Sequence, residues 1–156
     1  MEKLKIVVAG AVCVAVLGGG AWYWMSGAEA DVRLRPDEPE VVARGQNIYA
    51  AQCASCHGSK LEGQADWRER LPNGRLPAPP HDKAGHTWHH PDAQLFELTK
   101  RGPAAVVGGN YQSDMPAYAG VLSDEDIVAV LSYIKSTWPD RIRARHDEIN
   151  ERTDKQ

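Results

Sequence analysis

The stretch Cys53-Ala54-Ser55-Cys56-His57 holds two thiols separated by two residues and followed at once by an imidazole. On a short helical turn, side chains at i and i+3 lie on the same face. Two such thiols can form thioethers with the two vinyl groups at the edge of a haem, while the next residue offers a nitrogen to the iron. The spacing predicts one covalently bound haem c, attached at Cys53 and Cys56, with His57 as its first axial ligand.

Two other kinds of site also use closely spaced cysteines. A thioredoxin-like redox pair would lie at the junction of a strand and a helix, and the sequence around Cys53 has no strand pattern. A four-ligand zinc site would need a second closely spaced pair of ligands. The candidates for that pair are His81, His86, His89 and His90.

The second axial ligand determines what such a haem can do. An open position allows small molecules to bind, whereas a filled position suits electron transfer. Of the three methionines, Met1 begins the chain and Met25 lies in an apolar N-terminal segment. Met115 remains, next to Pro116, which fixes the local backbone. We expect Met115 to be the second ligand, with one of the histidines in 81–90 as the main alternative.

Helical periodicity predicts an all-α protein. Apolar residues share one face over 40–51, and this predicted helix runs directly into the cysteines. A second, shorter helix is predicted over 91–101. The clearest pattern covers 124–137, with Ser123 as a favourable N-cap and Pro139 after its end. No repeats and no strand pattern are present.

Two segments lack such a pattern. Glycines and prolines exclude long regular elements from 58–91, and a loop of that length needs an organising group such as haem. Residues 140–156 are highly charged and are predicted to form a surface helix or a frayed tail.

The N-terminal residues 1–28 are predicted to be an uncleaved membrane anchor. No charged residue lies between Lys5 and Glu29, and a helix over 6–28 would reach about 35 Å, enough for a hydrocarbon core of about 30 Å. The lysines before it favour a cytoplasmic N-terminus, and the aromatic residues 22–24 suit the far interface.

A cleaved signal peptide is the alternative, with cleavage after Ala30. The apolar run is longer than the usual ~7–15 residues of a signal peptide, which favours the anchor. Either interpretation exports the rest of the chain. Cys13 is interpreted as a small apolar residue of the span, and the polar, proline-containing residues 29–40 as a linker.

The composition limits the size and the partners of the protein. A chain of 156 residues suits one domain with appendages. With 18 basic and 21 acidic residues the formal charge is −3, and no broad basic face is present. Nucleic acid is therefore not expected as a partner.

From residue 41 to residue 138 the chain resembles the class I c-type cytochromes, of the bacterial monohaem membrane-anchored type. The resemblance rests on Gly45, Tyr49, Cys53–His57, Met115, Pro116, Val130 and Tyr133. It implies short helices wrapped around one haem in a domain spanning 41–139. In that family the first and last helices cross at a glycine and two aromatic residues, here Gly45, Tyr49 and Tyr133.

The resemblance also implies a function. Such a protein carries single electrons between respiratory membrane complexes, with a quinol–cytochrome c oxidoreductase as donor and a terminal oxidase as acceptor. It would be a carrier rather than an enzyme, on the periplasmic face of the cytoplasmic membrane. A fixed haem subunit of an oxidase or dehydrogenase complex is the alternative, and a haem- or metal-sensing protein is a third.

Several residues between the haem motif and the segment 81–90 are candidates for the haem pocket. Haem propionates are anionic, so indole and guanidinium donors nearby would hold them. The candidate donors are Trp67, Arg68, Arg70 and Arg75. The resemblance further implies that Pro79 or Pro80 accepts a hydrogen bond from His57, which would raise the basicity of that ligand.

The segment 85–90 (Gly-His-Thr-Trp-His-His) is the most unusual of the chain. One hypothesis is a second metal site, for copper or zinc. The favoured interpretation is a loop before a helix, with Trp88 packed near the haem.

Overall fold

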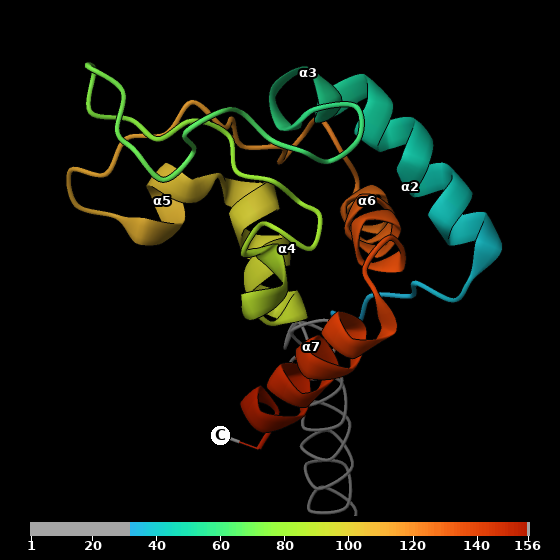
Figure 1. Cartoon of the computed structure of the whole chain (residues 1–156). Coiled ribbons are helices and arrows are strands. Elements are labelled where there is room, and N and C mark those ends of the chain that lie inside the picture. Colours follow the sequence, from blue (N-terminus) through green and yellow to red (C-terminus); the bar gives the residue numbers. More distant parts are fainter. Residues whose placement is uncertain (1–31, 156) are drawn as a thin grey trace, which may run out of the picture. The chain divides into compact units, whose positions relative to one another are not determined.

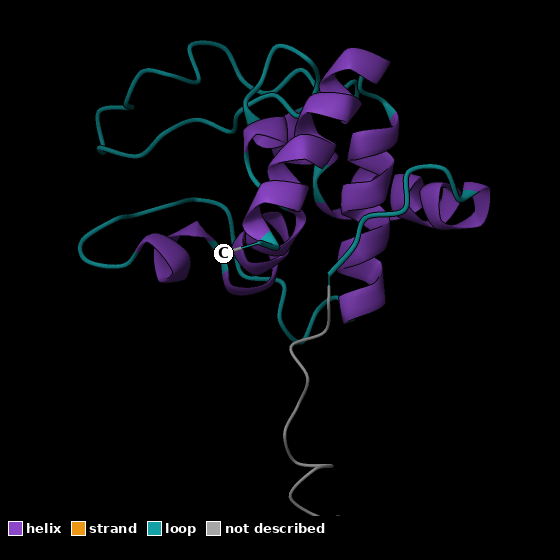
Figure 2. Cartoon of the chain, turned by 90° about the horizontal axis from the view of Figure 1, so that it is seen from below, coloured by secondary structure: helices purple, strands orange, loops and turns teal. Residues whose placement is uncertain are grey.

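The computed structural model describes residues 32–155, and all regular elements within this range are helices, apart from one isolated bridge between Ala119 and Leu122. Figures 1 and 2 show the helices and the long loops that leave them on one side. The helices are α2 (Pro39–Gln52), α3 (Ala54–His57), the 3₁₀ turn η1 (Thr87–His89), α4 (Asp92–Arg101), α5 (Pro103–Val107), α6 (Asp124–Ser136) and α7 (Asp140–Thr153). The predicted all-α fold is confirmed.

Helices α2 and α6 cross at Gly45. A Cβ atom there would overlap the carbonyl oxygen of Ala129 and lie 2.9 Å from the Cβ of Tyr133, so only glycine allows this approach. The rings of Tyr49 and Tyr133 pack beside the crossing, with centroids 5.5 Å apart. The crossing expected from the family resemblance is therefore confirmed.

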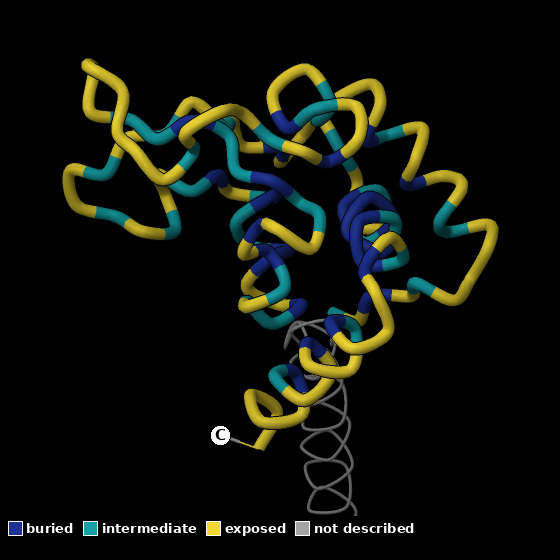
Figure 3. Tube along the Cα trace, viewed as in Figure 1, coloured by how far each residue is buried: buried dark blue, intermediate teal, exposed yellow. Residues whose placement is uncertain are grey.

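Helix α6 is the centre of the core, and Figure 3 shows that most of its length is buried. The Ser123 hydroxyl accepts from the backbone N–H of Asp126, and the Asp126 carboxylate accepts from the N–H of Ser123. This capping box satisfies two N–H groups that the first turn would otherwise leave free. The buried residues of the apolar stripe are Ile127, Val130, Leu131 and Ile134.

Helix α4 packs on this core through Leu95 and Phe96, both 6% exposed, whereas Leu98 is only half-buried. Helix α5 follows after Gly102 and begins at Pro103, a residue that suits the first helical position. The sequence did not predict α5, because five residues are too few to show helical periodicity.

The residues that precede α2 are packed on the domain rather than free. The sequence predicted a linker over 29–40, but Leu34 is 8% exposed and its N–H donates to Asp92 at 2.9 Å. The N–H of Arg35 donates to the Ser132 hydroxyl at 2.8 Å. Residues 32–38, called the strap below, therefore belong to the domain, and α2 begins at Pro39.

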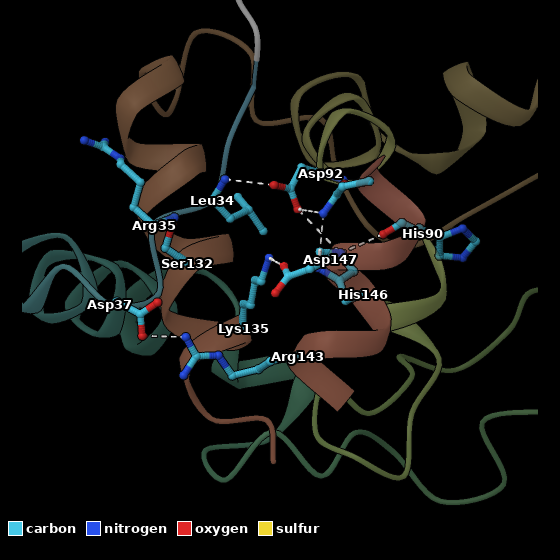
Figure 4. Close-up of polar contacts among 11 residues, drawn as sticks. Leu34, Arg35, Asp37, His90, Asp92, Ser132, Lys135, Arg143, His146 and Asp147 are labelled. Atoms are coloured by element: carbon cyan, nitrogen blue, oxygen red, sulfur yellow. Dashed lines mark hydrogen bonds and ion pairs between the residues drawn. The ribbon is translucent and has the colours of Figure 1, made fainter. Parts of the chain in front are cut away.

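The charged C-terminal segment forms α7, one of the two forms predicted for it. Its inward face consists of Ile142, His146 and Asn150, all buried. Figure 4 shows how α7, the strap and α6 meet around Asp92.

The predicted anchor at residues 1–28 lies outside the described residues. Within 32–155, no helix has both the length and the apolar character needed to cross a membrane.

Candidate functional site

The turn from Cys53 to His57 continues directly from α2. The N–H of Cys53 donates to the Tyr49 carbonyl, and the N–H of His57 to the Cys53 carbonyl, both at 2.9 Å. Cys53 is half-buried and Cys56 is exposed, and both are free thiols. Cys53 is the N-cap of α3 and Cys56 lies within it, so both thiols belong to one short helical turn, as the spacing predicts.

Burial raises the pKa of Cys53 to about 11, and the neighbouring Cys56 adds to the shift. At neutral pH this thiol is protonated, whereas a redox-active pair needs a lowered pKa and a thiolate. The electrostatics of the turn therefore do not support a thioredoxin-like pair.

The imidazole of His57 is 7% exposed, and its Nδ1 lies 2.8 Å from the carbonyl oxygen of Pro79. A carbonyl only accepts, so Nδ1 carries the proton and Nε2 keeps its lone pair. Burial lowers the pKa of His57, and the Pro79 carbonyl opposes this only in part. The ring is thus a neutral imidazole with one nitrogen available to a metal, held by the carbonyl of Pro79, one of the two prolines that the family resemblance implied for this role.

The side chain of Tyr49 connects α2 to the end of the cysteine turn through hydrogen bonds. Its hydroxyl donates to the carbonyl of Gly58 at 2.8 Å and lies 3.3 Å from that of His57. Its ring is 2% exposed, and burial raises the pKa of the phenol. The aromatic residue at the helix crossing therefore also fixes the backbone behind the imidazole.

The loop that carries Met115 is fastened to the same turn. The hydroxyl of Tyr118 donates to the Gln52 carbonyl at 2.7 Å, next to Cys53. Burial and the nearby thiols of Cys53 and Cys56 raise the pKa of Tyr118. The Met115 side chain is half-buried. The structure thus brings the Met115 loop to the cysteines, and ligation by Met115 stays a prediction.

A second contact joins this loop to the long loop at 58–86. Asp114, the residue before Met115, forms an ion pair with Arg75. Both loops leave the helices on the same side in Figures 1 and 2. The two irregular segments that flank the cysteine turn are therefore connected to each other.

The histidines of the segment 81–90 are distributed over separate contacts. His81 stacks on His57, His86 on Trp67 with centroids 5.3 Å apart, and His89 on Trp88 with centroids 3.6 Å apart. Residues 32–155 contain no group of three or more ligating side chains that could hold a metal ion. His86 and His90 meet edge to face with centroids 5.4 Å apart, but no third ligating side chain joins them within the described residues. The described residues therefore do not support the hypothesis of a second metal site in this segment.

Two buried donors have no hydrogen-bond partner within the described part of the chain, namely Nε of Arg75 and Nε1 of Trp88. A buried N–H without an acceptor costs about 1–3 kcal/mol, so such atoms indicate a missing acceptor. The carboxylates of a haem would supply one, and Arg75 was predicted for this role. The residues present therefore fit the group that the cysteines predict.

The other candidate donors to the haem propionates have contacts within the protein. The Trp67 ring stacks on His86, with the Arg68 guanidinium 4.1 Å from its centroid, and Arg70 donates to the Gly74 carbonyl. Trp88 is the tryptophan with the unpaired buried N–H, and it packs against the core. The sequence located Trp88 near the haem, but only its burial identifies its N–H as a free donor.

Comparison with known proteins agrees with this geometry. The family model described as Cytochrome c matches residues 42–138. The cytochrome c subunit of the cytochrome bc1 complex of Corynebacterium diphtheriae is 29% identical over 68 residues, which cover 42% of this chain and 24% of that protein. Subunit CcoP of the cbb3-type cytochrome c oxidase of Rubrivivax gelatinosus is 26% identical over 99 residues, 64% of this chain and 27% of CcoP.

The chain thus spans about a quarter of the length of these relatives. Among solved structures, cytochrome CL from Methylophaga aminisulfidivorans superposes with a TM-score of 0.51 at 17% identity, covering 78% of this chain and 76% of that chain. This likeness supports the fold alone. Because the family model covers more than half of the sequence, the chain belongs to the cytochrome c family, whose members bind haem c covalently and transfer electrons.

Proposed function

We propose that this protein is a monohaem electron carrier with His57 and Met115 as the axial ligands of its iron. The observation that carries the proposal is the attachment of the Met115 loop to the cysteine turn, through the hydrogen bond from Tyr118 to Gln52. This bond supports the assignment because it holds the loop that carries Met115 beside the residues that would attach the haem.

Other described residues support the same proposal. The haem supplies an Fe(II)/Fe(III) couple, and the protein sets its potential through the ligands and their surroundings. His57, with Nδ1 bound to the Pro79 carbonyl, is oriented and made more basic by that bond. The unpaired donors of Arg75 and Trp88 would hold the propionates.

The location and the partners are part of the same proposal. Residues 1–28 would anchor the protein in the cytoplasmic membrane, with the haem domain on the periplasmic face. A tether of this kind keeps a carrier at high effective concentration near membrane-bound partners. A quinol–cytochrome c oxidoreductase is the proposed donor and a terminal oxidase the proposed acceptor, because subunits of such complexes are among the relatives.

The ligand assignment is tested with carbon monoxide on the full-length, haem-loaded protein. We expect the reduced native protein not to bind carbon monoxide readily, because Met115 fills the sixth position. The variant Met115→Ala opens that position and is expected to bind it rapidly. Gln112→Ala, at an exposed residue of the same loop, is the matched control and should behave like the native protein.

Rapid binding of carbon monoxide by the native protein would contradict the electron-carrier assignment. An unreactive Met115→Ala variant would show that another side chain occupies the sixth position. The absorption spectrum of the denatured protein reports separately whether the haem is bound through thioethers.

A fixed subunit of a respiratory complex is the second candidate. It is favoured by the matched relatives, which are subunits of a bc1 complex and of a cbb3-type oxidase. Purification of the full chain in mild detergent distinguishes the two: a free carrier elutes alone, whereas a subunit co-purifies with one complex in fixed proportion.

A further inference from the structure

The imidazoles of His57 and His81 are stacked face to face. Their centroids are 4.0 Å apart and their planes differ by 24°. Within residues 32–155, the hydrogen bond of the His57 ring joins one ring atom, Nδ1, to the Pro79 carbonyl. A bond at a single atom leaves the ring free to rock about that contact, whereas a flat group packed on its face restricts the rotation.

His81 is itself rigidly fixed. Its N–H donates to the Leu61 carbonyl at 2.8 Å, and its carbonyl accepts from the indole of Trp138 at 2.7 Å. Its ring nitrogen Nδ1 lies 2.8 Å from the Thr87 hydroxyl. The edge of the ring meets Tyr49 at 6.3 Å between centroids. Backbone and ring are therefore held from four different segments, as a positioning group requires.

The stacking geometry also excludes His81 as the partner ligand of His57. Two ligands on opposite sides of one iron direct their nitrogen atoms toward each other along a line. Rings stacked at 4.0 Å lie side by side instead, so both are on the same side of any metal that His57 binds. The stacking therefore places His81 in contact with the ligand His57 and not in the position of the opposite ligand.

We propose that His81 is a positioning residue whose flat ring sets the rotational orientation of the axial ligand His57. The inference rests on the proposed function in one respect, namely that His57 binds the iron. The orientation of an axial imidazole decides which haem orbital shares its electron density with the ligand. In the oxidised protein this determines which of the haem methyl groups carry the most unpaired spin.

The test compares the variants His81→Leu and His81→Phe in the haem-loaded protein. Leucine removes the flat ring, and phenylalanine keeps a flat ring without the nitrogen atoms. We expect the proton NMR spectrum of oxidised His81→Leu to show a changed order and spread of the haem methyl shifts. His81→Phe should keep the native order. His86→Leu, an exposed histidine of the same segment that stacks on Trp67, is the matched control and should keep it too.

An unchanged methyl pattern in His81→Leu would overturn the inference, and so would an equal change in both His81 variants. If His81→Leu does not fold, Thr87→Val removes the hydroxyl that holds Nδ1 and should produce a smaller change of the same pattern. Carbon monoxide binding by the native protein tests the ligand assignment independently. If the reduced native protein does not bind carbon monoxide and the methyl pattern of His81→Leu is unchanged, the ligand assignment stands. In that case only the proposed role of His81 is refuted.

Discussion

At Gly45 a single missing side chain decides how closely the two main helices can pack. The Ala129 carbonyl that a Cβ would overlap belongs to the backbone of α6, which cannot move aside as a flexible side chain could. Tyr49, one turn further along α2, is buried at the same crossing and also holds the backbone of the haem-binding turn. Tyr49 therefore connects the crossing that Gly45 allows to the backbone that carries His57.

We expect Gly45→Ala to destabilise the protein by about 1–3 kcal/mol or more, because overpacking at a rigid backbone contact forces the helices apart. The gain in helix propensity from alanine, about 1 kcal/mol, acts in the opposite direction and does not outweigh the clash. Denaturant unfolding of the haem-loaded protein measures the effect. Gln46→Ala, exposed on the same helix, should change stability by less than about 0.5 kcal/mol. Equal stabilities of the two variants would mean that the crossing tolerates a methyl group.

Residues that act at short range in the sequence could be predicted well. The spacing of Cys53, Cys56 and His57 is a local pattern, and the turn has the expected form. The stacking of His81 on His57 could not be predicted, because it depends on how the loop between them folds back. The unpaired N–H of Trp88 is equally invisible in the sequence, since burial and hydrogen bonding are properties of the whole fold.

Among the elements, α7 differs most from its sequence pattern. Its inward face carries His146 and Asn150 beside Ile142, so hydrophobic periodicity gave little sign that the helix packs. The face is held instead by hydrogen bonds: the Asn150 side-chain oxygen accepts from the Asp92 N–H at 2.7 Å, and its amide lies 3.2 Å from the Asp92 carboxylate. Helix α6, with an apolar stripe and a capping box, was predicted almost to its ends.

The contact between α7 and α4 predicts a measurable cost for Asn150→Ala. The N–H of Asp92, at the first position of α4, has no partner within its own helix and would lose its acceptor. A buried donor left unpaired costs about 1–3 kcal/mol, and the cavity adds to this. Thermal unfolding of the haem-loaded protein checks the loss. Glu151→Ala, exposed on the same helix, is the control, and a loss as large there would show that helix propensity rather than the contact is responsible.

On the scale of the molecule, the strap and α7 close the domain around Asp92. Ion pairs join Arg143 to Asp37 and Arg33 to Asp154, both at 2.5 Å. Exposed pairs of this kind contribute about 0–1 kcal/mol each. The Asp92 carboxylate accepts from the N–H of Leu34, and Asn150 and His146 lie against it. The strap and α7 lie outside the residues 42–138 that the family model matches, whereas Asp92 lies within them. Its buried groups, rather than the surface pairs, should dominate the stability of the closure.

His146 is the titratable group at the centre of this closure. Its Nε2 donates to the His90 carbonyl at 2.9 Å, and its Nδ1 faces the Asn150 amide at 3.5 Å. A proton on Nδ1 would point at the amide hydrogens, so the network suits the neutral ring. Burial lowers the pKa of His146 from its ordinary value of 6.5, and the nearby Lys135 lowers it further, while Asp92 and Asp147 act in the opposite direction.

The lowered pKa predicts how stability changes with pH. Between the pKa of His146 in the folded protein and 6.5, its pKa in the unfolded chain, His146 is protonated in the unfolded chain but neutral in the folded protein. The unfolded state therefore gains stability from protonation as the pH drops through this range, and the free energy of unfolding falls. The slope for one group is at most about 1.4 kcal/mol per pH unit. Above 6.5 both states are neutral and the contribution is constant.

The variant His146→Gln isolates this contribution, because glutamine can still donate to the His90 carbonyl but does not titrate. We expect the stability difference between the native protein and His146→Gln to shrink as the pH is lowered from about 8 to about 5. Other histidines with a lowered pKa, such as His81 and His86, contribute equally to both proteins and cancel in the difference. Denaturant unfolding at a series of pH values measures it. A difference that stays constant over the range would mean that His146 takes up a proton without disturbing the closure.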